Sequence, residues 1–237
     1  MSIRITIATG LALAGCAADP ALPTSSPDGG AEDEIGELQQ SLTVVVRDTF
    51  ESHPLGPLGA PWSVDPGDSA HLATVVATAD HGRALQMDGP TTLGYWLLAT
   101  RTFSSDATTI RARVDVKPSP GSAFLWILDG AGSSIGRRRI RLQRAPGSTT
   151  LEAQTVPSGT TTCGTVPSGT WSRVTLVVHA RAWPHTFDVL IDGAPTACTG
   201  VDAGISPPFN GVQAMDASNE DWGGIVLFDN VLVSNPL

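Results

Sequence analysis

The stretch from Trp171 to Gly193 constrains the fold of this chain more than any other part of the sequence. Its first run, WSRVTLVVHA, alternates apolar with polar residues, and its second, HTFDVLIDG, does the same. Because successive side chains of a β-strand point to opposite faces, each run predicts a strand with one buried face. The short connection at Ala182–Pro184 predicts an antiparallel hairpin, and Asp192-Gly193 predicts a turn into the next segment.

The remainder of the chain after residue 42 has the same character. Gly (25 residues) and Pro (18 residues) are frequent, and turn signals separate short apolar runs at spacings of roughly 8–12 residues. More than ten short strands of this kind predict an all-β sandwich or barrel in one domain, residues 42–237. The predicted strands outside the hairpin are Thr43–Phe50, Trp62–Val64, Leu72–Thr78, Arg83–Met87, Tyr95–Phe103, Thr109–Val116, Ser122–Leu128, Arg138–Arg144, Thr150–Val156, Val212–Met215 and Ile225–Val233.

The N-terminus has the pattern of a targeting segment. Arg4 precedes a short apolar core, Ile5–Ala14, which is too short to span a bilayer of about 30 Å as a helix. The sequence that ends it, Leu-Ala-Gly-Cys at 13–16, resembles the lipobox of bacterial lipoproteins. The resemblance implies removal of residues 1–15, a lipid on Cys16, a cell-envelope location and, with Ala17 next, sorting to the outer membrane. The alternative is an ordinary secretory signal with an incidental cysteine.

Residues 16–41 predict a disordered tether between the lipid and the domain. Residues 17–41 carry six acidic residues and no Lys or Arg, and have few large apolar groups that could offset chain entropy. The formal net charge of the whole chain is −9. Because binding to nucleic acid needs a basic surface, this charge argues against nucleic acid as a partner.

The two cysteines other than Cys16 are Cys163 and Cys198, an even number in an oxidising compartment. We expect a disulfide between them, with two free buried thiols as the alternative. Two copies of Val-Pro-Ser-Gly-Thr, at 156–160 and 166–170, flank Cys163 and predict a loop around it.

Several of these runs together resemble a known fold family. The pair Trp171–Val178 and Thr186–Gly193, the final run VLFDNVLV at 226–233, and the opening Asp48–Glu51 with Trp62 resemble concanavalin A-like lectin/glucanase domains, laminin-G-like modules included. The resemblance implies a jelly-roll β-sandwich of two antiparallel sheets. It also implies that the concave sheet binds glycans.

Candidate ligand-binding residues come from one basic run and from the tryptophans. If RRRIRLQR at 137–144 is a strand, Arg139, Arg141 and Gln143 lie on one face, where guanidinium groups can bind carboxylates, sulfates or phosphates. A solvated or edge-guarding strand face is the alternative. Flat indole rings stack on sugars, and the candidates for this role are Trp96, Trp126 and Trp222, for which core packing is the alternative.

A structural calcium ion is the one cofactor that the resemblance suggests. In related jelly rolls such an ion joins the first and last strands, and Asp48, Glu51 and Asp229 occupy those strands here. The acidic loop Asp216–Asp221 is a second oxygen-rich segment. Solvated turn acids are the alternative for both.

Catalytic patterns are weak in this chain. Glucanases of this fold carry Glu-x-Asp-x-x-Glu on one strand, and that motif is absent. Gly132–Gly136 (GSSIG) matches a nucleophile-elbow pattern but lacks the strand–turn–helix setting, so we expect a loop. The sequence therefore favours a non-catalytic envelope protein that binds a polysaccharide or a surface protein. The alternatives are a hydrolase or lyase that uses Arg139, Arg141 and an Asp, and a structural or adhesion protein.

Overall fold

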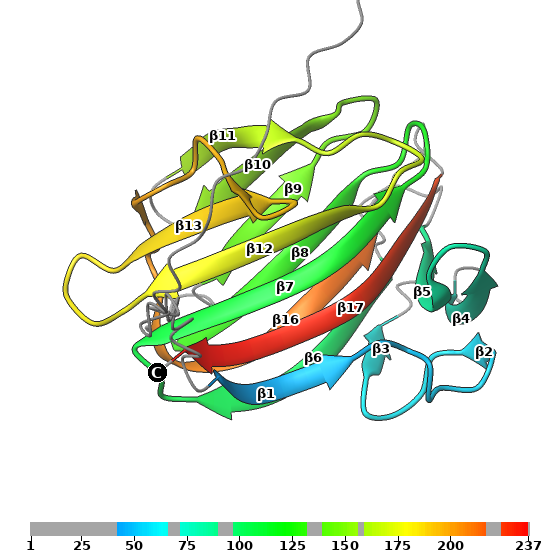
Figure 1. Ribbon diagram of the computed structural model, residues 1–237, viewed down its shortest axis with the longest axis horizontal. Coiled ribbons are helices and arrows are strands. Elements are labelled where there is room, and N and C mark those ends of the chain that lie inside the picture. The colour runs from blue at the N-terminus through cyan, green and yellow to red at the C-terminus, as the bar shows by residue number, and fades with distance from the viewer. Residues whose placement is uncertain are drawn as a thin grey trace, which may run out of the picture. The chain divides into compact units, whose positions relative to one another are not determined.

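The computed structural model describes residues 42–65, 72–89, 97–131, 139–155, 159–216 and 224–236. In these ranges the regular secondary structure is entirely β, and the strands form two antiparallel sheets (Figure 1). This confirms the predicted all-β sandwich. None of the described residues belongs to a helix that is long and apolar enough to cross a membrane. The predicted signal segment, Cys16 and the tether lie outside the described ranges.

The first sheet, called sheet A, has ten strands. Its main order is β14-β13-β12-β7-β17-β5-β4-β2, with β1 paired to β17 and β15 paired to β13. The bounds are β1 Leu42–Asp48, β2 Gly56–Pro57, β4 Ala73–Thr78, β5 Gly82–Asp88, β7 Thr109–Pro118, β12 Ser172–His179, β13 Thr186–Ile191, β14 Ala194–Pro195, β15 Val201–Asp202 and β17 Ile225–Pro236.

The second sheet, called sheet B, has seven strands in the order β11-β10-β9-β8-β16-β6-β3. It lies behind sheet A in Figure 1. The bounds are β3 Ser63–Asp65, β6 Leu97–Ser105, β8 Phe124–Ala131, β9 Arg139–Arg144, β10 Thr150–Thr155, β11 Gly159–Thr165 and β16 Ser206–Asp216.

The predicted hairpin is present as β12 and β13, which pair antiparallel from Val174 opposite Ile191 to His179 opposite Thr186. The apolar side chains of its inner face are buried, as the alternation requires. Asp192 (φ 52°) and Gly193 (φ 82°) both adopt positive φ at the turn into β14. Two consecutive positive φ values characterise the type I′ turn that Asp-Gly favours, so the sequence fixes the end of this strand locally.

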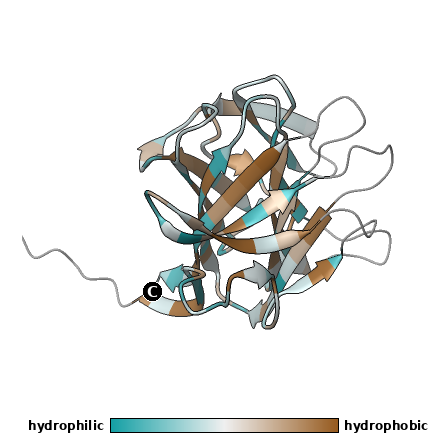
Figure 2. Ribbon diagram, turned by 90° about the vertical axis from the view of Figure 1, so that its right-hand side faces the viewer, coloured by the Kyte–Doolittle hydropathy of each residue, from teal (hydrophilic) through white to brown (hydrophobic). Residues whose placement is uncertain are grey.

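A continuous hydrophobic core lies between the two sheets and receives side chains from nearly every long strand. Phe124 of β8 meets Phe228 of β17 edge to face, with ring centroids 6.2 Å apart. Figure 2 shows hydrophobic and hydrophilic residues alternating along many of the strands. Since each fully buried aliphatic or aromatic side chain contributes about 1.5–3 kcal/mol, this layer is the main source of stability.

The predicted disulfide is confirmed, because Cys163 and Cys198 are bonded. The surroundings of Cys163 differ from the prediction. Residues 159–165 form strand β11, at the edge of sheet B, where a loop was expected. Cys198 follows β14, which lies at the edge of sheet A. The bond therefore joins the edges of the two sheets.

Candidate functional site

The predicted arginine strand is present as β9, and its polar side chains lie on the outer face of sheet B. The strand register aligns them with residues of the neighbouring strands in two rows across the sheet. We call these two rows the sheet B face. The first row is Ser63, Thr100, Gln213, Ile127, Arg141, Gln154 and Thr160, and the second is Asp65, Leu98, Met215, Leu125, Gln143, Glu152 and Thr162.

The sheet B face combines an apolar centre with polar groups beside it. Leu125, Ile127 and Met215 form a hydrophobic cluster separate from the main core, with Leu98 packed against it. Gln213 is 3% exposed and lies among them. An apolar surface with a few fixed polar groups is the usual composition of a binding site for small organic groups such as sugars.

Hydrogen bonds hold the polar side chains of this face in place. Arg141 Nη1 donates to Gln154 Oε1 at 3.0 Å, and Gln143 Nε2 donates to Glu152 Oε2 at 3.1 Å. Nε of Arg141 is buried without a hydrogen-bond partner. Burial lowers the pKa of the Arg141 guanidinium, and the positive charge of Arg139 lowers it further. An acceptor from a ligand would satisfy this donor and stabilise its charge.

Arg139, opposite Asp129 of β8, extends the same face by one more row. Arg144, the last residue of β9, points the other way and is 2% exposed. Its guanidinium donates to the carbonyl oxygens of Ser148 and Ser122 and to the hydroxyl of Ser168. Arg139 and Arg141 therefore lie on a face available for binding, whereas Arg144 is buried and fully hydrogen-bonded.

The structure corrects the prediction for Trp126. Its side chain is 0% exposed and belongs to the main core between the sheets, so its ring has no face to offer to a sugar. The other two predicted stacking residues, Trp96 and Trp222, lie outside the described residues, as does the GSSIG motif. Of the predicted ligand-binding set, the described part of the chain brings together Arg139, Arg141 and Gln143.

The three carboxylates predicted to hold calcium are each engaged by protein donors. Asp48 accepts hydrogen bonds from the Phe50 amide (2.8 Å) and Trp62 Nε1 (2.7 Å) and lies 3.0 Å from His53 Nε2. Glu51 accepts from the backbone amide of Arg83.

Asp229, the third member of that trio, lies 3.0 Å from His81 Nδ1. Among the residues that the structure describes, no group of three or more His, Cys, Asp or Glu side chains is arranged to hold a metal. Asp216 accepts a hydrogen bond from the Gly89 amide, and the rest of its acidic loop is not described. A calcium ion stays a prediction.

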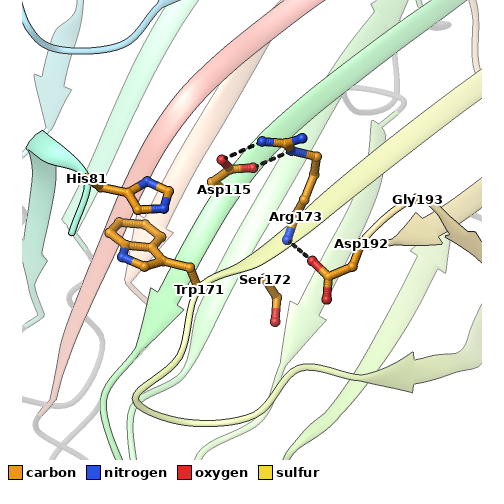
Figure 3. A pocket seen from close by; sticks show the side chains of 7 residues that line it. All are labelled: His81, Asp115, Trp171, Ser172, Arg173, Asp192 and Gly193. Atoms are coloured by element: carbon orange, nitrogen blue, oxygen red, sulfur yellow. Dashed lines mark hydrogen bonds and ion pairs between the residues drawn. The ribbon is translucent and has the colours of Figure 1, made fainter.

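A second polar site lies on the outer face of sheet A and was missed by the sequence analysis. It is a pocket of about 330 Å³ lined by His81, Asp115, Trp171, Ser172, Arg173, Asp192 and Gly193 (Figure 3). The rings of His81 and Trp171 stack with centroids 4.0 Å apart. Trp171 is half-buried at the wall of this pocket.

The charged groups of this pocket largely satisfy one another. Arg173 forms a bidentate ion pair with Asp115, with N–O distances of 2.8 and 3.0 Å. Asn230 Nδ2 donates to Asp115 and also contacts Asp229, which is the residue opposite Asp115 in the register. Burial raises the pKa of Asp229 to about 6, against the opposing effects of the Asn230 amide and His81. These bonds leave few polar groups available to a ligand, so we interpret the network as structural support for β7 and β17.

Comparisons with known proteins identify a fold and no family. No protein-family model matches the sequence, and no curated protein matches it. Among solved structures, the endo-1,3-β-glucanase from Streptomyces sioyaensis has a TM-score of 0.56 at 15% identity, with 89% of this chain and 99% of that one covered. The carbohydrate recognition domain of Emp47p has a TM-score of 0.52 at 9% identity, covering 82% and 95%.

A sialidase is matched over 81% of this chain but only 18% of its own length, with a TM-score of 0.57 and 11% identity. Identities this low carry information about the fold alone. Together with the two antiparallel sheets, these likenesses show that the domain is a concanavalin A-like jelly-roll sandwich.

Proposed function

We propose that this protein is a lipid-anchored component of the cell envelope whose β-sandwich binds a glycan without cleaving it. The observation that carries the proposal is the sheet B face, where Arg141, Gln143 and Gln154 flank an apolar centre. Guanidinium and amide groups offer paired donors and acceptors to neighbouring hydroxyls or carboxylates, and the apolar centre suits the carbon face of a sugar ring. The enzymes and the recognition domain that share this fold support a carbohydrate as the ligand class.

The placement of acids on this face supports a binding role over hydrolysis. Asp129 lies on β8 and Glu152 lies on β10, two strands away. The register also offsets them by four residues along the strand direction, so their Cα atoms are separated by roughly 17 Å. Glycosidases hold their two carboxyl groups about 5–10 Å apart. Asp65 lies farther still, on β3 at the opposite edge of the sheet. No pair of described carboxylates on this face has the required spacing.

The lipid anchor rests on Cys16 and the lipobox-like sequence before it. Attached acyl chains would hold the chain at a membrane, because each buried methylene contributes about 0.8 kcal/mol. Growth with an alkyne-tagged fatty acid should label the wild type, and Cys16→Ser should abolish the label and move the protein out of the detergent phase in phase partitioning. Equal labelling of both proteins would exclude this attachment.

The glycan proposal is tested with the full chain in a neutral detergent against a broad panel of polysaccharides, with calcium or with a chelator. Both the retained protein and any released sugar are measured. We expect retention by one class of polysaccharide without release. Arg141→Gln should weaken that retention about tenfold, the effect of losing one charged hydrogen bond. The matched control is Arg181→Gln, at the exposed end of the β12–β13 hairpin.

The possible results separate the candidate functions. Retention that Arg141→Gln weakens and Arg181→Gln does not would support a binding module at the sheet B face. Release of sugar would favour a hydrolase or lyase. No retention by any member of the panel would exclude the glycan and leave a surface protein or a structural role.

A further inference from the structure

Three arginines lie close together on the outer face of sheet A, on the opposite side of the sandwich from the sheet B face. Arg47 of β1 pairs with Leu232 of β17, and Leu232 pairs with Arg113 of β7. The two arginines therefore flank Leu232, at about 10 Å between their Cα atoms. Arg111 precedes Arg113 by two residues and lies on the same face, about 7 Å away. We call these three residues the sheet A arginines.

Among the residues that the structure describes, no acidic side chain forms an ion pair with the sheet A arginines. Within the described part of the chain, none of the three side chains forms a hydrogen bond or an ion pair, and Nε of Arg113 is buried without a partner. Arg173, on the adjacent strand β12, differs because it is bound by both oxygens of Asp115. Unpaired cations are unexpected in a chain with a net charge of −9, where acidic residues outnumber basic ones by 23 to 14.

A small pocket lies between two of these arginines. It has a volume of about 170 Å³ and is lined by Val44, Arg47, Thr49, Arg113, Asn230, Val231 and Leu232. That volume is several times the roughly 30 Å³ that a water molecule takes up in the liquid, so a group of five heavy atoms fits. The hydroxyl of Thr49 adds a neutral polar group to the two guanidiniums, whereas Nδ2 of Asn230 is already engaged by Asp115 and Asp229.

The electrostatics of the pocket favour an anion. Burial lowers the pKa of Arg113, and the positive charges of Arg173, Arg111 and Arg47 lower it further, against the opposing effect of Asp115. A bound anion would offset this repulsion and give the buried Nε an acceptor. Guanidinium groups bind multi-oxygen anions through parallel hydrogen bonds, and two such groups on opposite sides of a pocket suit a tetrahedral anion better than a planar carboxylate.

We propose that the pocket between Arg47 and Arg113 binds a phosphate- or sulfate-type oxyanion, with Arg111 adding to the positive field. The ligand is either a small ion or the same group carried as an ester on a polymer. This site is separate from the sheet B face, so it does not depend on the proposed glycan binding.

The test uses the full chain in a neutral detergent at low ionic strength, where such attraction is least screened. Calorimetric titration with inorganic phosphate and with inorganic sulfate measures binding of the free ion, which is the first arm of the test. Retention on dextran sulfate compared with unsulfated dextran measures binding of the polymer ester, which is the second arm. The variants are Arg47→Gln and Arg113→Gln, and Arg47→Gln changes an exposed side chain that packs in no core. Arg181→Gln is the control, since it removes one positive charge at an exposed position outside both proposed sites.

We expect saturable binding of at least one ion, weakened about tenfold or more by either variant at the pocket and unchanged in the Arg181→Gln control. Binding of dextran sulfate with the same dependence identifies a polymer ester as the source, and binding of the free ion alone identifies a small ligand. Absence of binding in both arms would overturn the proposal. Equal weakening by all three substitutions would overturn it as well, because it would indicate a response to net charge alone.

Discussion

Nδ1 of His81 lies 3.0 Å from Oδ2 of Asp229, which connects the turn between β4 and β5 to the last strand of the chain. The Asp229 side chain is 3% exposed, and Asp115 lies opposite it in the register. A buried carboxylate beside a second carboxylate costs free energy when both are ionised, because neither is well solvated. The network around Asp229 therefore makes stability depend on pH.

We predict that Asp229→Asn alters this pH dependence. Burial raises the pKa of Asp229 from 3.8 to about 6, so between these values the folded protein keeps a proton that the unfolded chain releases. The free energy of unfolding of the wild type should therefore fall relative to the variant as the pH rises from 4 to 6. The expected change over the whole titration is on the order of 3 kcal/mol, and above about pH 7 the difference should remain constant.

Urea denaturation of both proteins at pH 4, 5, 6, 7 and 8 measures this difference. The pair of values at pH 7 and 8 is the internal control, since the difference should not change there. A difference between the two proteins that stays the same from pH 4 to pH 6 would contradict the assigned cause.

Arg173→Ala should destabilise the protein through Asp115. That carboxylate is 4% exposed and would lose two hydrogen bonds from a charged donor while keeping the one from Asn230. Because hydrogen bonds to charged groups contribute about 1.5–3 kcal/mol, we expect a loss of stability in that range. A double-mutant cycle with Asp115→Asn should show a positive coupling energy, and additive effects of the two substitutions would show that the pair contributes nothing.

The hairpin and the confirmed strands could be predicted because their pattern is local. Period-two alternation determines which side chains of β12 and β13 are buried, and Asp192-Gly193 specifies its own turn. Strand β11 carries no such pattern, since GTTTCGT has a single apolar residue, Cys163, and lies at a sheet edge with little burial. The neighbouring Pro and Gly residues therefore favoured a loop in the sequence analysis.

The candidate sites depend on pairing between distant strands, which local patterns do not encode. Asp115 and Arg173 are 58 residues apart and meet only because β7 lies beside β12. Trp126 was misplaced for a different reason. Strand β8 is apolar on both faces, with Leu125 and Ile127 buried on the outer side, so alternation could not show which way the indole points.

The corrected position of Trp126 predicts a stability effect in place of a binding effect. Trp126→Ala should cost about 3–5 kcal/mol, since it leaves a cavity in the core between the sheets. Trp183→Ala is the matched control, because Trp183 is 73% exposed at the end of the β12–β13 hairpin and should change stability by less than about 0.5 kcal/mol. Thermal and urea unfolding of both variants measure the effects, and similar losses in the two would contradict the assignment of Trp126 to the core.

Removing the disulfide should weaken the edge where the two sheets meet. Cys163 and Cys198 are separated by 35 residues, and in the chain-entropy model a loop of this length stabilises the folded state by roughly 3–4 kcal/mol. We therefore expect the double variant Cys163→Ala, Cys198→Ala to lose about that much in free energy of unfolding. Because the bond connects β11 to the segment after β14, amide hydrogen exchange should accelerate in these two strands more than in central strands such as β7 and β8.

Reductant provides the control for this prediction. Unfolding of the wild type in the presence of a reductant should shift to the midpoint of the double variant, and the variant itself should not respond. A variant as stable as the wild type would mean that the packing of the buried Cys163 and Cys198 side chains, rather than the covalent link between them, holds β11 against sheet A.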